Sequence, residues 1–424
     1  MEHKAYPHIG ETLYCETLPN GLKLRVVPKP GFRGSCAVLA VNYGGAHRRF
    51  TLDGALHETP AGVAHYLEHK MFDLPEGDGT MDEFAANGAD PNAFTSQATT
   101  CYFFHCAEHF AENLRLLLHL VATPYFTEET VAKEQGIIAQ EILEEDDSPD
   151  GAVYYNLMAQ LYAHHPLRDK VIGSVESIRQ ITAQTLYDCH RAFYAPANLC
   201  LCVEGDVDPE EVAHIARELL PAESGPLPET DFGPAESPLP LETLHRAQMD
   251  VAAPQFLIGA KLCPLGADLL RERLTASLAL RVLVGSSSDF YNRLYAQGLL
   301  SRDYDVELDF SLGQGTLLLG GESRDPEAVL RELVQELSRA SREGLDPGRF
   351  ERAKRSSLGA RLRGLEDFEG VCIALAEGTF DGSSPLEAAS LLQSIRREDC
   401  EAWLREHLGP ERLALSIIEP RRSE

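Results

Sequence analysis

The chain has 424 residues, which is long for a single hydrophobic core and predicts two domains. Its 38 Lys and Arg residues against 66 Asp and Glu residues give a formal net charge of −28 at pH 7. This charge disfavours nucleic acid and anionic membranes as partners, because both are negatively charged. The sequence has no run of about 18 apolar residues and begins without a basic head before an apolar segment. We therefore expect no membrane span, no secretory signal and a cytoplasmic protein.

The first half of the chain mixes strand patterns with amphipathic helix patterns. Strands are marked by alternation of apolar and polar residues or by β-branched and aromatic runs, and helices by apolar residues every three or four positions. In chain order, the predicted elements are a strand at 21–27, a strand at 35–43, a helix at 62–72, a strand at 91–105, helices at 108–122 and 127–145, and a strand at 198–205.

Residues 221–243 interrupt every periodic pattern and are rich in proline and carboxylates, as in an exposed linker. The second half then repeats a similar order of elements, which makes an internal duplication plausible. Its predicted elements are a strand at 255–262, a helix at 267–283, strands at 304–312 and 315–320, and helices at 326–343 and 347–364.

The strongest chemical signal is the sequence His-Tyr-Leu-Glu-His at residues 65–69. His65 and His69 are four residues apart, so on a helix they project from one face and can both reach one zinc ion at about 2.0–2.1 Å. Glu68 lies beside them without being a ligand, where a general base can take a proton from water. The pattern is the inverted form of the common zincin motif. Five residues alone leave open a helix with two histidines and a Glu in an ordinary ion pair.

A catalytic zinc needs a third protein ligand and an open fourth position. The predicted helix at 127–145 offers Glu134 and Glu141, which are seven residues apart and therefore share a face. The spacing does not decide which of the two carboxylates binds the metal.

These motifs together resemble the insulinase, pitrilysin and mitochondrial-processing-peptidase family of inverted-motif zinc metallopeptidases, in its bacterial half-size branch. The resemblance rests first on residues 65–69 followed by the segment KEQGIIAQEI at 133–142. It implies that Glu141 is the third zinc ligand and that Glu134 supports the site from outside the ligand set. Shorter matches follow in order at residues 92–96, 165–167, 172–174, 176–178, 193–198 and 205–206.

The resemblance also implies the architecture of the chain. We expect an α+β fold with two homologous domains, each a mainly antiparallel sheet with helices packed on one face. The first, residues 1–220, would be the N-terminal zinc-binding catalytic domain. Residues 221–243 would be the linker, and residues 244–424 would be a C-terminal homologous domain without the zinc motif.

The implied function is that of a zinc-dependent endopeptidase that hydrolyses peptides or unfolded segments in an enclosed cavity. The substrate would bind as an added β-strand along the strand that contains Asn92, Ala93, Phe94 and Thr95. Two alternatives stay open at this point. The chain could be a non-catalytic zinc-binding scaffold subunit, or it could hydrolyse a non-peptide amide.

The second half lacks a feature that active members of this family carry, an Arg and a Tyr seven residues apart that reach the substrate. Alignment on Gly298 places Leu294 and Ser301 at these two positions. Arg302 and Tyr304 lie close by at the wrong spacing. The chain is therefore expected to lack the clamp that stabilises an oxyanion. We expect a heterodimer with a homologous, motif-lacking subunit that supplies the Arg and the Tyr, with a homodimer as the second choice.

Overall fold

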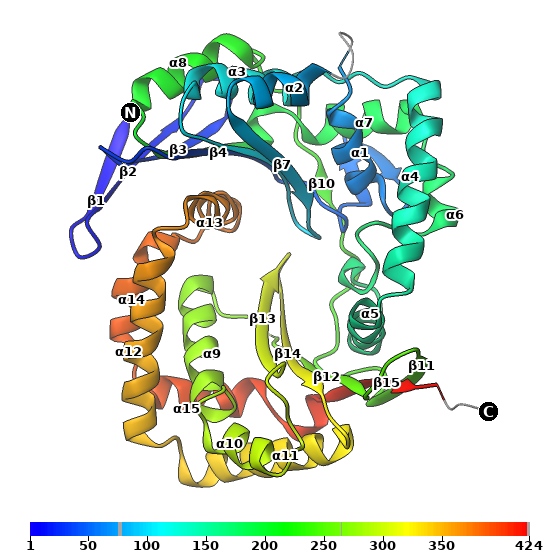
Figure 1. Cartoon of the computed structure of the whole chain (residues 1–424), viewed down its shortest axis with the longest axis vertical. Coiled ribbons are helices and arrows are strands. Elements are labelled where there is room, and N and C mark those ends of the chain that lie inside the picture. Colours follow the sequence, from blue (N-terminus) through cyan, green and yellow to red (C-terminus); the bar gives the residue numbers. More distant parts are fainter. Residues whose placement is uncertain (75–78, 264, 422–424) are drawn as a thin grey trace. The chain divides into compact units, whose positions relative to one another are not determined.

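The structure is a computed structural model that describes residues 1–74, 79–263 and 265–421. The chain forms two compact units (Figure 1). Unit 1 comprises residues 1–142, 170–232 and 362–387, and unit 2 comprises residues 143–169, 233–361 and 388–424.

Unit 1 is built on a seven-stranded sheet in which only β3 and β9 pair in parallel. Its strands, in spatial order, are β1 (Glu2–Tyr6), β2 (Glu11–Thr17), β3 (Lys23–Pro28), β9 (Leu199–Gly205), β4 (Ser35–Val41), β8 (Thr100–Cys106) and β7 (Ala89–Thr95). A separate small sheet has the order β10 (Glu229–Thr230), β5 (Arg49–Leu52) and β6 (Ala55–Glu58). In the part of the chain that the structure describes, strand β7 pairs only with β8 and is therefore an edge strand of the large sheet.

Both faces of the seven-stranded sheet are buried. Strand β4 shows this directly, because Leu39 packs into one hydrophobic cluster and its neighbour Val38 packs into another, and side chains alternate between the faces of a strand. Several helices cover the first face, and α13 covers the second. The helices of unit 1 are α1 (Val63–Met71), α2 (Gly79–Ala86), α3 (Phe110–Ala122), most of α4 (Glu128–Asp146), α6 (Val175–Ile178), α7 (Ala183–Phe193), α8 (Pro209–Leu219) and α13 (Phe368–Asp381).

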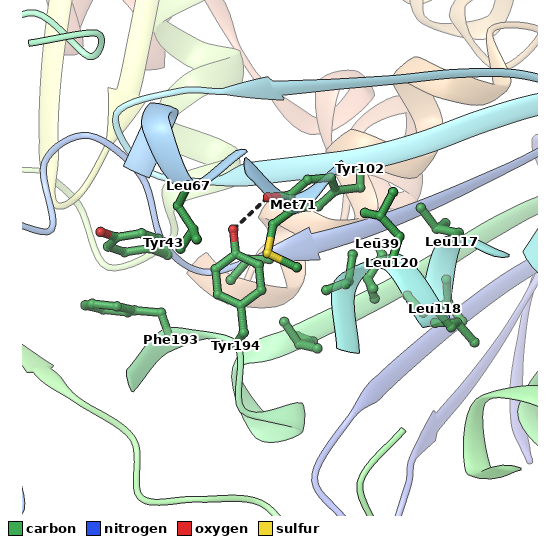
Figure 2. Close-up of a cluster of buried hydrophobic side chains, with 14 of the residues drawn as sticks. Leu39, Tyr43, Leu67, Met71, Tyr102, Leu117, Leu118, Leu120, Phe193 and Tyr194 are labelled. Carbon is green, nitrogen blue, oxygen red and sulfur yellow. Dashed lines mark hydrogen bonds between the residues drawn. The ribbon is translucent and has the colours of Figure 1, made fainter. Parts of the chain in front are cut away.

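Helix α1 is anchored by its apolar side. Figure 2 shows Leu67 and Met71 of α1 in the core beside Tyr102 and Tyr194, whose hydroxyl groups are joined by a hydrogen bond of 2.8 Å. All four side chains are almost completely buried. Because this packing fixes the rotation of α1, it also fixes the direction in which its polar side chains point.

Unit 2 is built on a five-stranded sheet in which β11 and β15 pair in parallel and the other neighbours are antiparallel. Its strands, in spatial order, are β11 (Leu244–Met249), β15 (Ala414–Pro420), β12 (Gln255–Lys261), β14 (Gln314–Glu322) and β13 (Asp305–Ser311). The helices are α5 (Pro149–Leu161), α9 (Leu269–Leu283), α10 (Asp289–Ala296), α11 (Pro326–Glu343), most of α12 (Pro347–Gly364), α14 (Ala388–Ser394) and α15 (Arg397–His407). Helices α9, α11 and α15 contribute to the larger core on one face of the sheet, and α5 packs on the other face.

The observed secondary structure confirms the predicted α+β class with mainly antiparallel sheets. Each compact unit nevertheless consists of three segments of the chain, whereas the sequence analysis expects one division at residues 221–243. Helix α5 comes from the first half of the sequence and belongs to unit 2, whereas α13 comes from the second half and belongs to unit 1. Each sheet therefore has, on its second face, one helix supplied by the other half of the sequence.

One predicted strand is two strands in the structure. Residues 91–105 form most of β7 and β8, which are joined by a tight turn at residues 96–99. Ser96 makes this turn, because its N–H donates to the carbonyl of Thr99 and its hydroxyl oxygen accepts from the N–H groups of Ala98 and Thr99. Among the described residues, no helix combines the length and apolar character needed to cross a membrane.

Candidate metal centre

Helix α1 begins at a position that only glycine suits. Gly62, its N-cap, has a φ of 93°, and a Cβ atom there would lie 2.5 Å from the carbonyl oxygen of Ile172. The helix can therefore start close against the loop that contains Ile172. This start determines where the next turn places His65, Glu68 and His69.

His65 and His69 lie side by side on α1, as their spacing predicts. The centroids of their rings are 4.6 Å apart. Glu68 is buried, with 8% of its surface exposed, and it accepts a hydrogen bond of 2.6 Å from the hydroxyl group of Thr95 on β7. This contact holds one carboxylate oxygen of Glu68, Oε2, in a fixed position.

Helix α4 brings both candidate carboxylates to these histidines. Oε1 of Glu141 lies 3.6 Å from Nε2 of His65, and its Oε2 lies 3.7 Å from Nε2 of His69. Oε1 of Glu134 lies 2.9 Å from Nδ1 of His69. The two carboxylates therefore contact different nitrogen atoms of the His69 ring, although their spacing of seven residues places them on the same face of α4.

The donor atoms of three residues converge, which is the arrangement that a metal ion requires. One ligand atom from each of His65, His69 and Glu141 lies within 4.8 Å of the other two. Three ligands of this kind match the protein share of a catalytic zinc site, which keeps its fourth position open. Glu134 fits a supporting role, because a proton on Nδ1 of His69 that is shared with Glu134 leaves Nε2 free to bind a metal. The described residues therefore fit a zinc ion.

The electrostatics of the site agree with this geometry. The hydrogen bond to His69 lowers the pKa of Glu134, and the imidazole of His65, 3.6 Å away, lowers the pKa of Glu141. Burial lowers the pKa of His69, but its hydrogen bond with Glu134 and the nearby carboxylates outweigh that effect and raise it. Both carboxyl groups are thus held in the charged form that binds cations.

Two contacts that the sequence did not reveal stabilise this arrangement. The hydroxyl group of Tyr66 on α1 donates to the carbonyl of Val131 on α4, so the two helices are joined directly beside the candidate ligands. The side-chain amide of Gln135 on α4 donates to the carbonyl of Ile178 at 3.0 Å. The sequence shows that both side chains can donate hydrogen bonds. It does not show which groups accept them, because the acceptors are backbone carbonyls distant in the sequence.

The strand proposed to bind substrate has the required free edge. Because Ser96 and Thr99 are hydrogen-bonded across the turn, alternate residues of β7 direct their backbone toward β8, and the backbone of Ala93 points away from the sheet. The side chain of Asn92 accepts from the N–H of Ala93 at 2.9 Å. Phe94 packs against the core on the second face of the sheet, and Thr95 binds Glu68.

The positions predicted to lack the Arg and Tyr clamp lie in unit 2. Leu294 on α10 is buried, and the carbonyl of Ser301 accepts from Tyr291. Tyr304 is buried and donates to the carbonyl of Val284 at 2.9 Å, while Arg302 is exposed. Tyr304 is thus engaged in the core of its own unit, which disfavours its movement to a substrate.

Comparison with known proteins gives the family. The family model described as Insulinase (Peptidase family M16) matches residues 52–175, and the model described as Peptidase M16 inactive domain matches residues 180–357. A Bacillus subtilis protein named uncharacterized zinc protease YmfH is 34% identical over 427 residues, which cover 98% of each chain. The chain belongs to the M16 family.

Solved structures agree with this membership. The crystal structure of an M16-like peptidase from Alicyclobacillus acidocaldarius superposes with a TM-score of 0.93 at 31% identity, and the match covers 99% of this chain and 100% of that chain. The periplasmic protease PqqL from Escherichia coli shares the fold, with a TM-score of 0.76 at 17% identity. The match with PqqL covers 96% of this chain but 47% of that chain, so this chain corresponds to one half of PqqL. The segment matched by the insulinase model contains all five residues of the candidate metal centre, namely His65, Glu68, His69, Glu134 and Glu141.

Proposed function

We propose that this M16 protein is a zinc-dependent endopeptidase in which His65, His69 and Glu141 bind zinc and Glu68 is the general base. The observation that carries the proposal is the convergence of three donor atoms within 4.8 Å, with Glu68 on the same helix as two of them. The names of similar proteins, which call them zinc proteases, support both the metal and the reaction class.

Each residue of the site has a definite task in this reaction. Zinc, when bound, is a Lewis acid that polarises a carbonyl group and lowers the pKa of water. Glu68 would take the proton of the attacking water and pass it to the leaving amine. Thr95 occupies Oε2 of Glu68, which leaves Oε1 for the proton. Glu134 would keep His69 in the tautomer that presents Nε2 to the metal.

The substrate would be an extended polypeptide that pairs with the free edge of β7. Residues Asn92 to Thr95 would bind it, with the outward backbone of Ala93 making the hydrogen bonds. Pairing of this kind depends on hydrogen bonds between backbone groups, so the selectivity for substrate side chains at this strand would be modest. Folded globular proteins would be poor substrates, because their chains are not free to add as a strand.

The same proposal includes a partner. The chain has Leu294 and Ser301 where active members of the family carry an Arg and a Tyr, and it spans only one half of a double-length relative, PqqL. We therefore place the missing oxyanion stabiliser on a homologous, motif-lacking subunit in a heterodimer. A homodimer that uses Arg293 or Tyr304 instead is the second choice. It would first have to break the ion pair of Arg293 with Glu332 or the contact of Tyr304 with Val284.

The test is a peptide-library digest with matched measurement of zinc, run with and without the homologous subunit. The unaltered chain should bind about one zinc ion, and cleavage should increase on addition of the subunit. His65→Ala and Glu141→Gln should lose zinc and cleavage together, and the chelator phenanthroline should abolish cleavage. Glu129→Gln, an exposed position on α4, is the matched control and should keep both.

The digest also separates the alternatives. Zinc binding without cleavage of any peptide, in either the presence or the absence of the subunit, would identify a scaffold and contradict the proposal. Cleavage of small amides but not of peptides would contradict it as well. Retained cleavage after the loss of zinc would show that the reaction does not need the metal.

A further inference from the structure

The second face of the seven-stranded sheet in unit 1 is rich in cysteine. Five buried free thiols belong to the hydrophobic cluster on this face, namely Cys36, Cys101, Cys200, Cys202 and Cys372. The first four lie on strands β4, β8 and β9, and Cys372 lies on α13, the helix that covers them (Figure 1). A buried cysteine often serves only as a small apolar residue, so a chemical role requires neighbours that change the reactivity of the thiol.

Cys36 has such neighbours. Its Sγ lies 4.0 Å from Nε2 of His105, which occupies the paired position on the adjacent strand β8. The same Nε2 lies 2.8 Å from Oε2 of Glu369 on α13. The side chain of His105 is 42% exposed and that of Glu369 is 37% exposed. The imidazole ring of His105 therefore connects the buried thiol of Cys36 to solvent.

A second thiol lies beside Cys36. Cys372 is three residues after Glu369 on α13, so both side chains point to the same side of the helix. The Cys372 thiol, with the help of His105, lowers the pKa of Cys36 to about 6 although burial opposes both. Cys36 in turn raises the pKa of His105 to about 9, whereas burial raises the pKa of Cys372. Near pH 7 a thiolate, an imidazolium and a neutral thiol are thus in contact.

A closer pair of thiols on the same face has a different geometry. The Sγ atoms of Cys200 and Cys202 are 3.6 Å apart, but the two residues lie on one strand with a single residue between them. Their Cα–Cβ bonds run in parallel and start about 6.8 Å apart. A disulfide requires Cβ atoms about 3.5–4.5 Å apart, which this pair could reach only if the strand bent. Cys36 and Cys372 lie on facing elements, where two Cβ atoms can point toward each other.

We propose that Cys36 and Cys372 form a reversible disulfide when the protein meets hydrogen peroxide, with His105 as the proton donor. First, the thiolate of Cys36 attacks one peroxide oxygen and the O–O bond breaks. The departing hydroxide takes the proton of His105 and leaves as water, so that Cys36 becomes a sulfenic acid. The thiol of Cys372 then attacks the sulfur of this sulfenic acid, the S–O bond breaks, and the hydroxyl group leaves with the thiol proton as a second water.

The reaction oxidises two thiols and reduces one peroxide to two water molecules. Its product joins β4 to α13 within unit 1. Because Cys36 and Cys372 are far apart in the sequence, the new bond restricts the unfolded chain and should stabilise the folded one. This modification goes beyond the proposed hydrolysis and does not depend on it, since none of its residues belongs to the metal centre.

The test is peptide mapping of the full chain after exposure to hydrogen peroxide, with free thiols blocked by N-ethylmaleimide during denaturation. Trypsin releases Cys36 in the peptide 34–48 and Cys372 in the peptide 364–396, and each of these peptides contains one cysteine. The two peptides should be recovered as one linked species that dithiothreitol separates. Met81, which is 44% exposed, reports in the same digest that the oxidant has acted. Recovery of both peptides as unlinked thiols after Met81 is oxidised would overturn the proposal.

Variants assign the role of each residue. Cys372→Ser should stop at the sulfenic acid of Cys36, which dimedone traps, whereas Cys36→Ser should give neither the adduct nor the link. His105→Gln should slow the reaction at pH 7 by about tenfold or more, because the thiolate fraction falls about tenfold for each unit that a thiol pKa rises above the pH. This difference should shrink at pH 9. Cys101→Ser, a buried thiol of the same cluster, is the matched control and should keep the link.

Two results with these variants would contradict the assignment. One is a disulfide of Cys372 that forms in Cys36→Ser as readily as in the unaltered chain. The other is a rate for His105→Gln equal to that of Cys101→Ser at pH 7. The melting temperature of each reduced variant checks its fold. Oxidation should raise the melting temperature of the unaltered chain and leave that of Cys372→Ser unchanged, and an equal response of both would overturn the proposed bond.

Discussion

The contact of Glu134 with His69 makes a prediction that distinguishes a supporting carboxylate from a ligand. In the structure, Oε1 of Glu134 lies 2.9 Å from Nδ1 of His69, on the opposite side of the ring from the nitrogen that faces Glu141. Removal of this carboxylate by Glu134→Ala should leave all three metal ligands in place. It should also release the His69 ring from one tautomer and one orientation.

The expected cost follows from the role of such contacts. Loss of the partner that orients a metal-binding histidine typically weakens metal affinity by about 10–100-fold. In free energy of binding this range corresponds to about 1.4–2.7 kcal/mol. Glu141→Ala removes a ligand instead, so its effect should be larger than that of Glu134→Ala by a clear margin.

The assay is a competition titration of zinc against a chromophoric chelator, which yields a dissociation constant for each variant. Glu129→Ala, at an exposed position of the same helix, controls for the loss of one negative charge from α4. If Glu134→Ala abolished zinc binding and Glu141→Ala left it intact, the roles of the two carboxylates would be the reverse of those assigned.

Three further predictions concern residues around and away from the metal. Thr95→Val should lower turnover by about tenfold with zinc content unchanged, because Glu68 loses a charged hydrogen bond, and Thr95→Ser should restore it. Gly62→Ala should lower the free energy of unfolding in urea by about 1–3 kcal/mol, and an unchanged midpoint would contradict the strain at the start of α1. Burial raises the pKa of Glu204 to about 8 despite Lys29 at 3.0 Å, so the folded state holds this proton longer than the unfolded state. Stability should then fall as pH rises from about 5 to 8, by at most about 1.4 kcal/mol per pH unit, and Glu204→Gln should remove this slope.

The sequence predicts an element correctly where neighbouring residues alone determine its structure. Helices α11 and α12 have the bounds that amphipathic periodicity and the prolines at 326 and 347 predict. The motif at 65–69 likewise required only that one helix form, after which the spacing of four placed both histidines together. These features depend on residues within a few turns of one another.

The remaining features depend on tertiary contacts. Glu134 and Glu141 share a face of α4, so their spacing does not distinguish them. Only the packing of α4 against α1 places Glu134 at Nδ1 of His69 and Glu141 at Nε2. Helices α5 and α13 each cover a sheet that the other half of the sequence builds. No local sequence pattern shows which sheet such a helix covers, because an apolar helix face packs equally well on any apolar sheet of suitable shape.

The central claim is that Glu68 is the general base of a zinc peptidase. Its most direct test is the peptide-digest rate of Glu68→Gln, measured at a zinc content equal to that of the unaltered chain and with the same partner subunit present. Gln has nearly the shape of Glu but cannot take the proton, so zinc binding and fold should persist and turnover should be lost. Glu83→Gln, at an exposed position on α2, should cleave at the rate of the unaltered chain. Unimpaired cleavage by Glu68→Gln would contradict the account.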